Sequence, residues 1–119
     1  MDQIADKFIQ FQQQVRMLHW QTKSYARHKA YGDYYDGLSS SIDEFIETYM
    51  GKYGRVKTAG TIELKNIDDI SVTVFLDEVK DFLMGLTSEL DETEDTDLLN
   101  IRDEMLGHTK KLSYFLTLK

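Results

Sequence analysis

Four residues between positions 28 and 47 have the types and the spacing of ligands for a metal ion. They are His28 and three acidic residues, Asp36, Asp43 and Glu47, which follow it by 8, 15 and 19 positions. At about 100° per residue in an α-helix, the four side chains point at about 0°, 80°, 60° and 100°. One imidazole and three carboxylates therefore share one stripe, and nitrogen and oxygen ligands of this kind suit a hard or borderline cation.

This stripe has two interpretations. The apolar residues of the same segment, Leu38, Ile42 and Phe45, point at about 280°, 320° and 260°, so the centre of their stripe is more than a right angle away from the three acidic side chains. The stripe could therefore be an ordinary solvated helix face. Alternatively it is half of a metal site, in which Asp43 and Glu47 chelate one cation across a single helical turn and a facing subunit supplies the remaining ligands.

Two other histidines also have two interpretations each. His19 lies beside an apolar seam and directly before Trp20, the only tryptophan. It is either a packing residue or a ligand that meets the His28 stripe across a subunit contact, and Trp20 is interpreted as an anchor of a core or an interface. His108 falls in the apolar stripe of the last helix, which predicts a buried histidine with a hydrogen-bond partner, or else a metal ligand. Because no Glu-x-x-His sequence occurs, a carboxylate-bridged di-iron site inside a single bundle is not expected.

The composition narrows the class of protein. The chain has 119 residues, 41% of them hydrophobic, and contains no cysteine and no proline. We expect one domain over residues 1–119, with neither disulfides nor thiolate metal sites. No stretch approaches the roughly 20 apolar residues of a membrane span, and the first residues are neither basic nor apolar enough for a signal peptide. The expectation is a cytoplasmic protein without membrane contact.

The charge is unevenly distributed along the chain. The formal net charge is −7, and 14 of the 21 acidic residues lie between Glu63 and Met105. There is no basic tail, and binding through DNA phosphates needs clustered lysine and arginine. The sequence therefore argues against DNA as a partner.

Two other enzyme classes find no support in the motifs. The serines at 39–41 are not part of a Gly-x-Ser-x-Gly sequence, and the glycines at 51 and 54 do not belong to a Gly-Lys-Ser/Thr phosphate loop. Nucleophilic and nucleotide chemistry are therefore not expected.

Four segments with heptad-like apolar stripes must position the candidate ligands. They predict helices over about 2–24, 28–53, 72–90 and 98–115. Gly51 and Gly54 favour the end of the second helix, and Asp95, Thr96 and Asp97 favour the start of the fourth. About 16 residues connect the second helix to the third, which is enough to cross a bundle from end to end. The pattern predicts an all-α, ferritin-like four-helix bundle with a long crossover between helices 2 and 3.

The ligand candidates resemble a known family. His19-Trp20, a second histidine at 28 and then Asp43-x-x-x-Glu47 are similar to the motif of the miniferritins of the starvation-induced DNA-binding protein (Dps) family. The intervals of 15 and 19 residues from the second histidine agree with that family. The fourth helix is also similar, through Asp97-Leu98-Leu99 and Lys111-Leu112-x-x-Phe115-Leu116.

The resemblance implies a function and a partner. In that family, two histidines of one subunit face the Asp and Glu of a two-fold mate in a twelve-subunit shell that stores ferric mineral. By this resemblance, His19 and His28 would meet Asp43 and Glu47 of a second copy and bind and oxidise Fe(II). The chain would then be a ferroxidase and a homo-oligomer with a dimer as its minimal unit.

The chain also departs from that family. The family's aspartate four residues after the second histidine falls on Gly32, so that Asp33 or Asp36 would have to replace it. The missing ligand supports an alternative, in which the chain is a non-catalytic, ferritin-like assembly protein with a degenerate metal site. A further alternative is an acidic adaptor whose turn at 91–97 docks on a basic partner.

Overall fold

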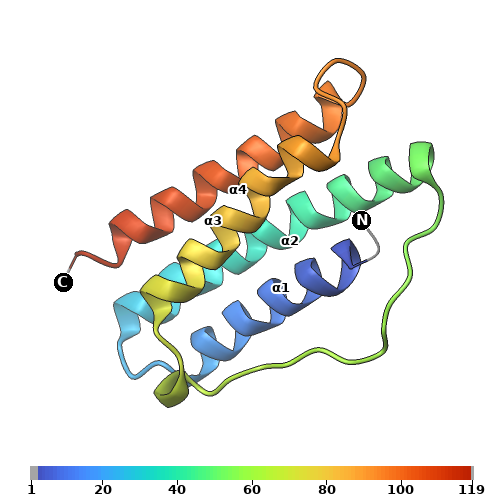
Figure 1. Ribbon diagram of the computed structural model, residues 1–119. Coiled ribbons are helices and arrows are strands. Elements are labelled where there is room, and N and C mark those ends of the chain that lie inside the picture. The colour runs from blue at the N-terminus through green and yellow to red at the C-terminus, as the bar shows by residue number, and fades with distance from the viewer. Residues whose placement is uncertain (1–2, 119) are drawn as a thin grey trace.

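The computed structural model describes residues 3–118 and contains four α-helices (Figure 1). They are α1 (Ile4–Gln21), α2 (Tyr25–Tyr53), α3 (Val72–Glu89) and α4 (Thr96–Phe115). A single 3₁₀ turn, η1 (Ile67–Asp69), precedes α3, and residues 3–118 contain no strand. The expected all-α four-helix bundle is therefore confirmed. None of these helices is both long and apolar enough to cross a membrane.

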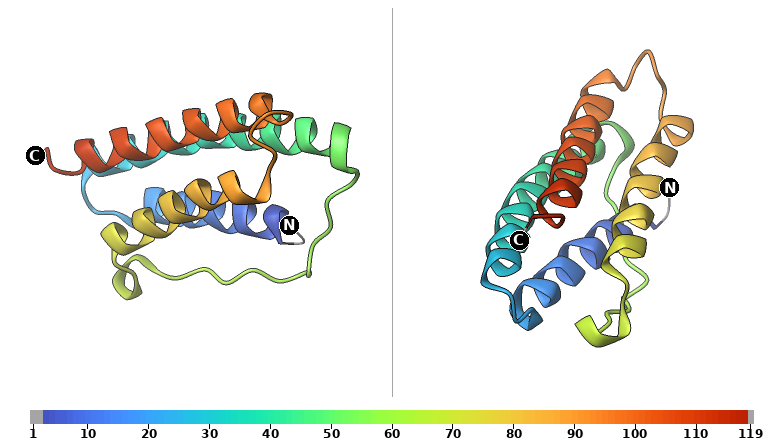
Figure 2. Two further views of the ribbon diagram at one scale, coloured as in Figure 1. Left: turned by 45° about the horizontal axis from the view of Figure 1, so that its top comes forward. Right: turned by 90° about the vertical axis from the view of Figure 1, so that its left-hand side faces the viewer.

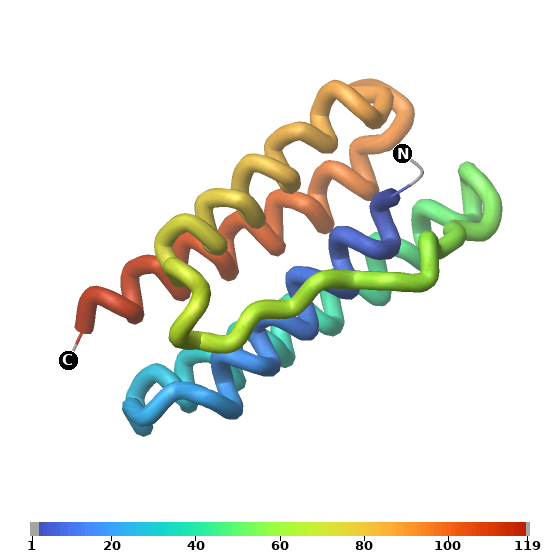
Figure 3. Tube along the Cα trace, turned by 60° about the horizontal axis from the view of Figure 1, so that its bottom comes forward, coloured from blue at the N-terminus to red at the C-terminus, as the bar shows by residue number. Residues whose placement is uncertain are grey.

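The connections set the order of the helices in space. Short turns at 22–24 and 90–95 make α1 antiparallel to α2 and α3 antiparallel to α4 (Figure 2). The chain between α2 and α3 returns along the length of the bundle and runs beside α1 (Figure 3). The long crossover expected between the second and third helices is thus present, with α2 packed between α1 and α4.

The ends of α2 follow from local signals. The helix begins at Tyr25, three residues before the predicted start at His28, because the Ser24 hydroxyl accepts a hydrogen bond from the Arg27 backbone N–H at 3.2 Å. It ends where Gly54 adopts a φ of 88°, a left-handed conformation that favours glycine. The additional first turn matters for the site, because it places the backbone around His28 in helical geometry.

The core is a continuous apolar cluster between the four helices. Phenylalanine rings pack edge to face across α1, α2 and α3, with centroid distances of 5.3–6.1 Å between Phe8 and Phe45, Phe8 and Phe82, Phe11 and Phe75, and Phe11 and Phe82. Edge-to-face contacts of this kind add about 0.5–1.5 kcal/mol each beyond the burial of area. The aromatic packing fixes how α1 lies against its neighbours and therefore where its last turn meets α2.

The prediction of a buried His108 was wrong. His108 is exposed, and Thr109 is completely buried in its place. The Thr109 hydroxyl donates to the Met105 carbonyl at 2.8 Å, so the Tyr34 hydroxyl donates to Thr109 at 2.7 Å. Burial raises the pKa of Tyr34 to about 12. A pair of hydroxyls in the core thus selects which residue of α4 faces inward.

Glutamines of α1 hold the crossover, a feature that the sequence analysis did not find. The buried Gln14 amide donates to the Lys65 carbonyl and accepts from the Lys65 N–H, both at 2.9 Å. Gln10 and Gln21 bond to the same segment, at Glu63 and at Ile67. Residues 63–65 of the crossover belong to no helix or strand, so their backbone groups need hydrogen-bond partners from elsewhere, and the glutamine side chains supply them.

A buried carboxylate ties the end of α2 to the turn before α4. Asp95, which is 0% exposed, accepts hydrogen bonds from Lys52 Nζ at 2.6 Å, from the Tyr53 hydroxyl and from the Asp91 N–H at 2.9 Å. The bond from Lys52, followed by that from Tyr53, lowers the pKa of Asp95 to about 2. The acidic turn is therefore anchored to the bundle through Asp95.

Candidate functional site

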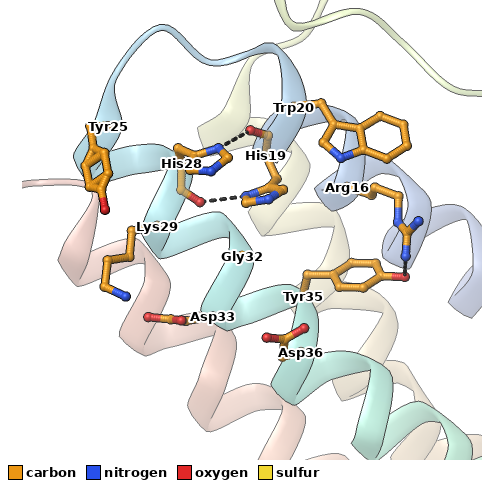
Figure 4. A pocket seen from close by; sticks show the side chains of 10 residues that line it. All are labelled: Arg16, His19, Trp20, Tyr25, His28, Lys29, Gly32, Asp33, Tyr35 and Asp36. Atoms are coloured by element: carbon orange, nitrogen blue, oxygen red, sulfur yellow. Dashed lines mark hydrogen bonds between the residues drawn. The ribbon is translucent and has the colours of Figure 1, made fainter.

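A cavity of about 520 Å³ opens on the outer face of the bundle where the last turn of α1 meets the first turns of α2 (Figure 4). Two imidazoles, two carboxylates, two cations and three aromatic rings gather around it. The cavity is lined by Arg16, His19, Trp20, Tyr25, His28, Lys29, Gly32, Asp33, Tyr35 and Asp36. It therefore contains three of the five predicted ligands.

The short turn between α1 and α2 brings His19 and His28 together. Their rings stack with centroids 3.9 Å apart and planes 16° from parallel. His19 Nδ1 bonds to the His28 carbonyl at 2.7 Å, and His28 Nδ1 bonds to the His19 carbonyl at 2.8 Å. Figure 4 shows these two bonds as a reciprocal pair that closes the end of the α1–α2 hairpin.

These hydrogen bonds fix the tautomer of both rings. A carbonyl oxygen can only accept, so Nδ1 carries the proton in each histidine. In a neutral imidazole, the Nε2 atom then keeps its lone pair. Metal-binding histidines commonly donate their second ring nitrogen to a carbonyl or carboxylate in this manner. The Nε2 atom of each neutral ring can therefore accept a hydrogen bond or bind a cation.

Gly32 allows the His19 ring to lie against α2. A Cβ atom at position 32 would stand 2.9 Å from His19 Cε1, closer than such atoms approach, and 3.1 Å from His19 Nδ1, which is a tight contact. A side chain at this position is therefore incompatible with the observed place of the His19 ring. The Dps pattern has an aspartate at this position, and in this fold such a side chain would require the His19 ring to move.

The carboxylates divide into two groups. Asp33 and Asp36 line the cavity, whereas Asp43 and Glu47 are exposed further along the same face of α2 and do not line it. At about 1.5 Å per residue, Asp43 lies roughly 22 Å along the helix from His28. Residues 3–118 contain no group of three or more side chains that could hold a metal ion. The predicted ligands therefore do not form a complete site within one copy.

Arg16 is a cavity residue that the sequence analysis missed. Its guanidinium donates to the Tyr35 hydroxyl and lies 4.6 Å from the Tyr35 ring centroid and 5.5 Å from that of Trp20. Trp20 is 62% exposed, so it is not a core anchor. The spacing of four residues between Arg16 and Trp20 was the available signal, since it places both on one face of a helix.

His108 lies outside this cavity. It lines a smaller hollow of about 130 Å³ between α2 and α4, together with Lys111 and Phe115. The third histidine is thus separated from the His19 and His28 pair, and it serves below as a control.

Known proteins with similar sequences carry little functional description. A family described as "Family of unknown function (DUF5856)" matches residues 19–116, which include all five predicted ligands. The chain is also similar to an "Uncharacterized 14.6 kDa protein in mobD-ri intergenic region" of Enterobacteria phage T4. The two are 29% identical over 101 residues, which cover 85% of this chain and 75% of the phage protein. No solved structure matches the chain.

Proposed function

We propose that this chain, which belongs to the DUF5856 family, is a Dps-like miniferritin that binds Fe(II) between two copies and oxidises it. The observation that carries the proposal is the His19 and His28 pair, in which both Nδ1 atoms bond to carbonyls and both Nε2 atoms keep their lone pairs. The pair lies at an open cavity on the outer face of the α1–α2 layer, where a second copy has access.

The acidic residues supply the other half of the proposed site. Asp43 and Glu47 are one helical turn apart, exposed and on the same face of α2 as His28. A second copy that lies antiparallel on this face would bring its own Asp43 and Glu47 over the histidine pair. Two-fold symmetry would then form two equal sites in each dimer.

This ligand set suits the oxidation of iron. Fe(II) is a borderline cation that accepts imidazole nitrogen, whereas Fe(III) is harder and prefers carboxylate oxygen. A site with both ligand types binds the substrate and stabilises the product. Each Fe(II) gives one electron to dioxygen or peroxide and leaves as Fe(III).

Asp36 was predicted as a replacement for the missing aspartate, and it lines the cavity. It is eight residues after His28, which is roughly 12 Å along α2. We therefore assign the ligand roles to His19, His28, Asp43 and Glu47, and not to Asp36.

An experiment with Fe(II) in air tests the oxidation. The rate of ferric absorbance is measured for the wild type, for His28→Ala combined with Glu47→Ala, and for the control His108→Ala. The combined variant loses two proposed ligands, so we expect it to lose at least the roughly 100-fold that mutation of a ligand's hydrogen-bond partner can cost, and we expect no loss for the control. Equal rates for the wild type and the combined variant would refute the proposal.

Mixing two inactive variants tests whether the site is shared. One variant carries His19→Ala and His28→Ala, and the other carries Asp43→Ala and Glu47→Ala. Each is expected to be inactive alone, because both of its symmetric sites lack half of the ligands. After joint refolding, random pairing makes half of the dimers mixed, and each mixed dimer has one intact site. The mixture should regain about a quarter of the wild-type rate, and no recovery would exclude a shared site.

A second function rests on the steric finding at Gly32. Because this position carries no carboxylate, and a side chain there would displace the His19 ring, the metal site could be degenerate in a non-catalytic assembly protein. This alternative predicts an oligomer in native mass spectrometry that leaves the rate of iron oxidation unchanged. A monomer would contradict both functions and favour the acidic adaptor.

A further inference from the structure

The charges on α2 are arranged against the dipole of the helix. Its first turn contains no acidic residue, and the exposed His28 and Lys29, at about 0° and 100°, share the stripe of the acids near the end where backbone N–H groups already carry partial positive charge. The exposed acids Asp43 and Glu47 lie in the other half of the same helix. The face is thus self-complementary, because an antiparallel copy would place acids over bases in both halves.

The proposed function fixes where a two-fold axis would cross this face, and the inference below rests on that function. If position 28 of one copy meets positions 43–47 of the other, the axis passes the midpoint, near residue 36 or 37 of α2. The residues that flank the axis are then those at the end of the cavity farthest from the turn between α1 and α2.

Two opposite charges lie at this midpoint. Asp36 is exposed on α2, and Arg16 lines the same cavity from α1 (Figure 4). The ion pairs within residues 3–118 do not include either of them. A two-fold axis beside Asp36 would bring two carboxylates together, and a guanidinium from each copy would neutralise that pair.

The surface of α1 beside Arg16 also has exposed apolar side chains that a second copy could cover. Relative to Arg16, the side chains of Ile9 and Trp20 point at about 20° and 40° around α1, so the three share one stripe. Ile9 is 41% exposed and Trp20 is 62% exposed. The chain measures 43 × 29 × 21 Å. Its broad face is therefore larger than the roughly 800 Å² that each partner buries in a stable complex.

We infer that the α1–α2 face is a two-fold interface between copies of this chain, in which Arg16 of one copy pairs with Asp36 of the other. Each dimer contains two such pairs beside the axis. Arg16 and Asp36 act as positioning residues, since they set the register that brings the histidines of one copy to the acids of the other.

Charge reversal tests this pairing. The dissociation constant of the dimer is measured by analytical ultracentrifugation in chelator-treated buffer for Arg16→Glu, for Asp36→Arg and for the two combined. Each single variant places four like charges at the axis and should weaken the dimer by about 30-fold or more. The combined variant restores both pairs in reversed order and should return to within about fivefold of the wild type. Lys110→Glu, an exposed change on α4, is the control.

Every outcome of this experiment decides the inference. Weaker dimerisation of both single variants, with recovery in the combined variant, supports the inference. The inference is overturned if the single variants dimerise as tightly as the wild type, or if they dimerise more weakly and the combined variant does not recover. It is also overturned if the wild type stays monomeric. Circular dichroism of each variant separates lost association from lost folding. Iron oxidation is measured on the same samples, so that a restored dimer without oxidation refutes the proposed function and leaves the pairing in place.

Discussion

Replacement of Gly32 by alanine tests the contact on which the histidine pair depends. Gly32 lies inside α2, where alanine normally stabilises a helix by about 1 kcal/mol relative to glycine. The new Cβ atom would stand 2.9 Å from His19 Cε1, so the ring has to move. The ring is held by its hydrogen bond to the His28 carbonyl, and loss of this bond costs about 1 kcal/mol. The two effects should cancel, which leaves the free energy of unfolding nearly unchanged.

Gly107 provides the matched control. It lies inside α4, and a Cβ atom at this position meets nothing within 4 Å. Gly107→Ala should therefore show the full helix gain of about 1 kcal/mol. The free energies are measured by urea denaturation followed by far-ultraviolet circular dichroism, and the two variants should differ by about 1 kcal/mol.

A double-mutant cycle identifies His19 as the cause. In a His19→Ala background the clash is absent, so Gly32→Ala should regain about 1 kcal/mol. If Gly32→Ala stabilises the wild type as much as Gly107→Ala does, the His19 ring does not lie over Gly32. The steric account of the missing carboxylate would then be wrong.

Three further predictions concern the elements that hold the site in place. Thr109→Val removes the acceptor of the buried Tyr34 hydroxyl and should destabilise the protein by about 1–3 kcal/mol in urea denaturation, with part of the loss recovered when Tyr34→Phe is added. The pKa of Asp95 is lowered from 3.8 to about 2, so its contribution to stability is present above pH 3.8 and is lost as the pH falls toward 2. The melting temperature of the wild type should therefore fall over this pH range, and that of Asp95→Asn should change less. Gln14→Leu removes both bonds to the Lys65 backbone and should accelerate hydrogen exchange of the Lys65 amide, while an unchanged exchange rate would show that the crossover is held elsewhere.

Much of the fold could be predicted because helical periodicity is a local property. The apolar stripes gave four helices, and the structure moves their ends by only a few residues, as at Tyr25, where the Ser24 cap adds a turn. Gly51 and Gly54 were both expected at the end of α2; Gly54, with its positive φ, is the C-cap, whereas Gly51 lies within the last turn of the helix.

The wrong prediction at His108 has a definite physical origin. Apolar residues recur after three or four positions, and both 108 and 109 satisfy this spacing between Met105 and Leu112. The difference was decided across the bundle, where the Tyr34 hydroxyl needs a partner inside the core and finds Thr109. A hydrogen bond between residues 75 positions apart leaves no trace in a local pattern.

In the candidate site, too, some features follow from local sequence and others depend on contacts between distant residues. The sequence by itself determined that His28, Asp36, Asp43 and Glu47 share one face of α2, because the rotation per residue is the same in every α-helix. Only the tertiary structure decided that His19 stacks on His28, that each ring donates to the carbonyl of the other, and that a side chain at position 32 would displace the His19 ring. These contacts depend on the direction in which a three-residue turn returns α2 along α1, and this direction is set by packing over the whole bundle.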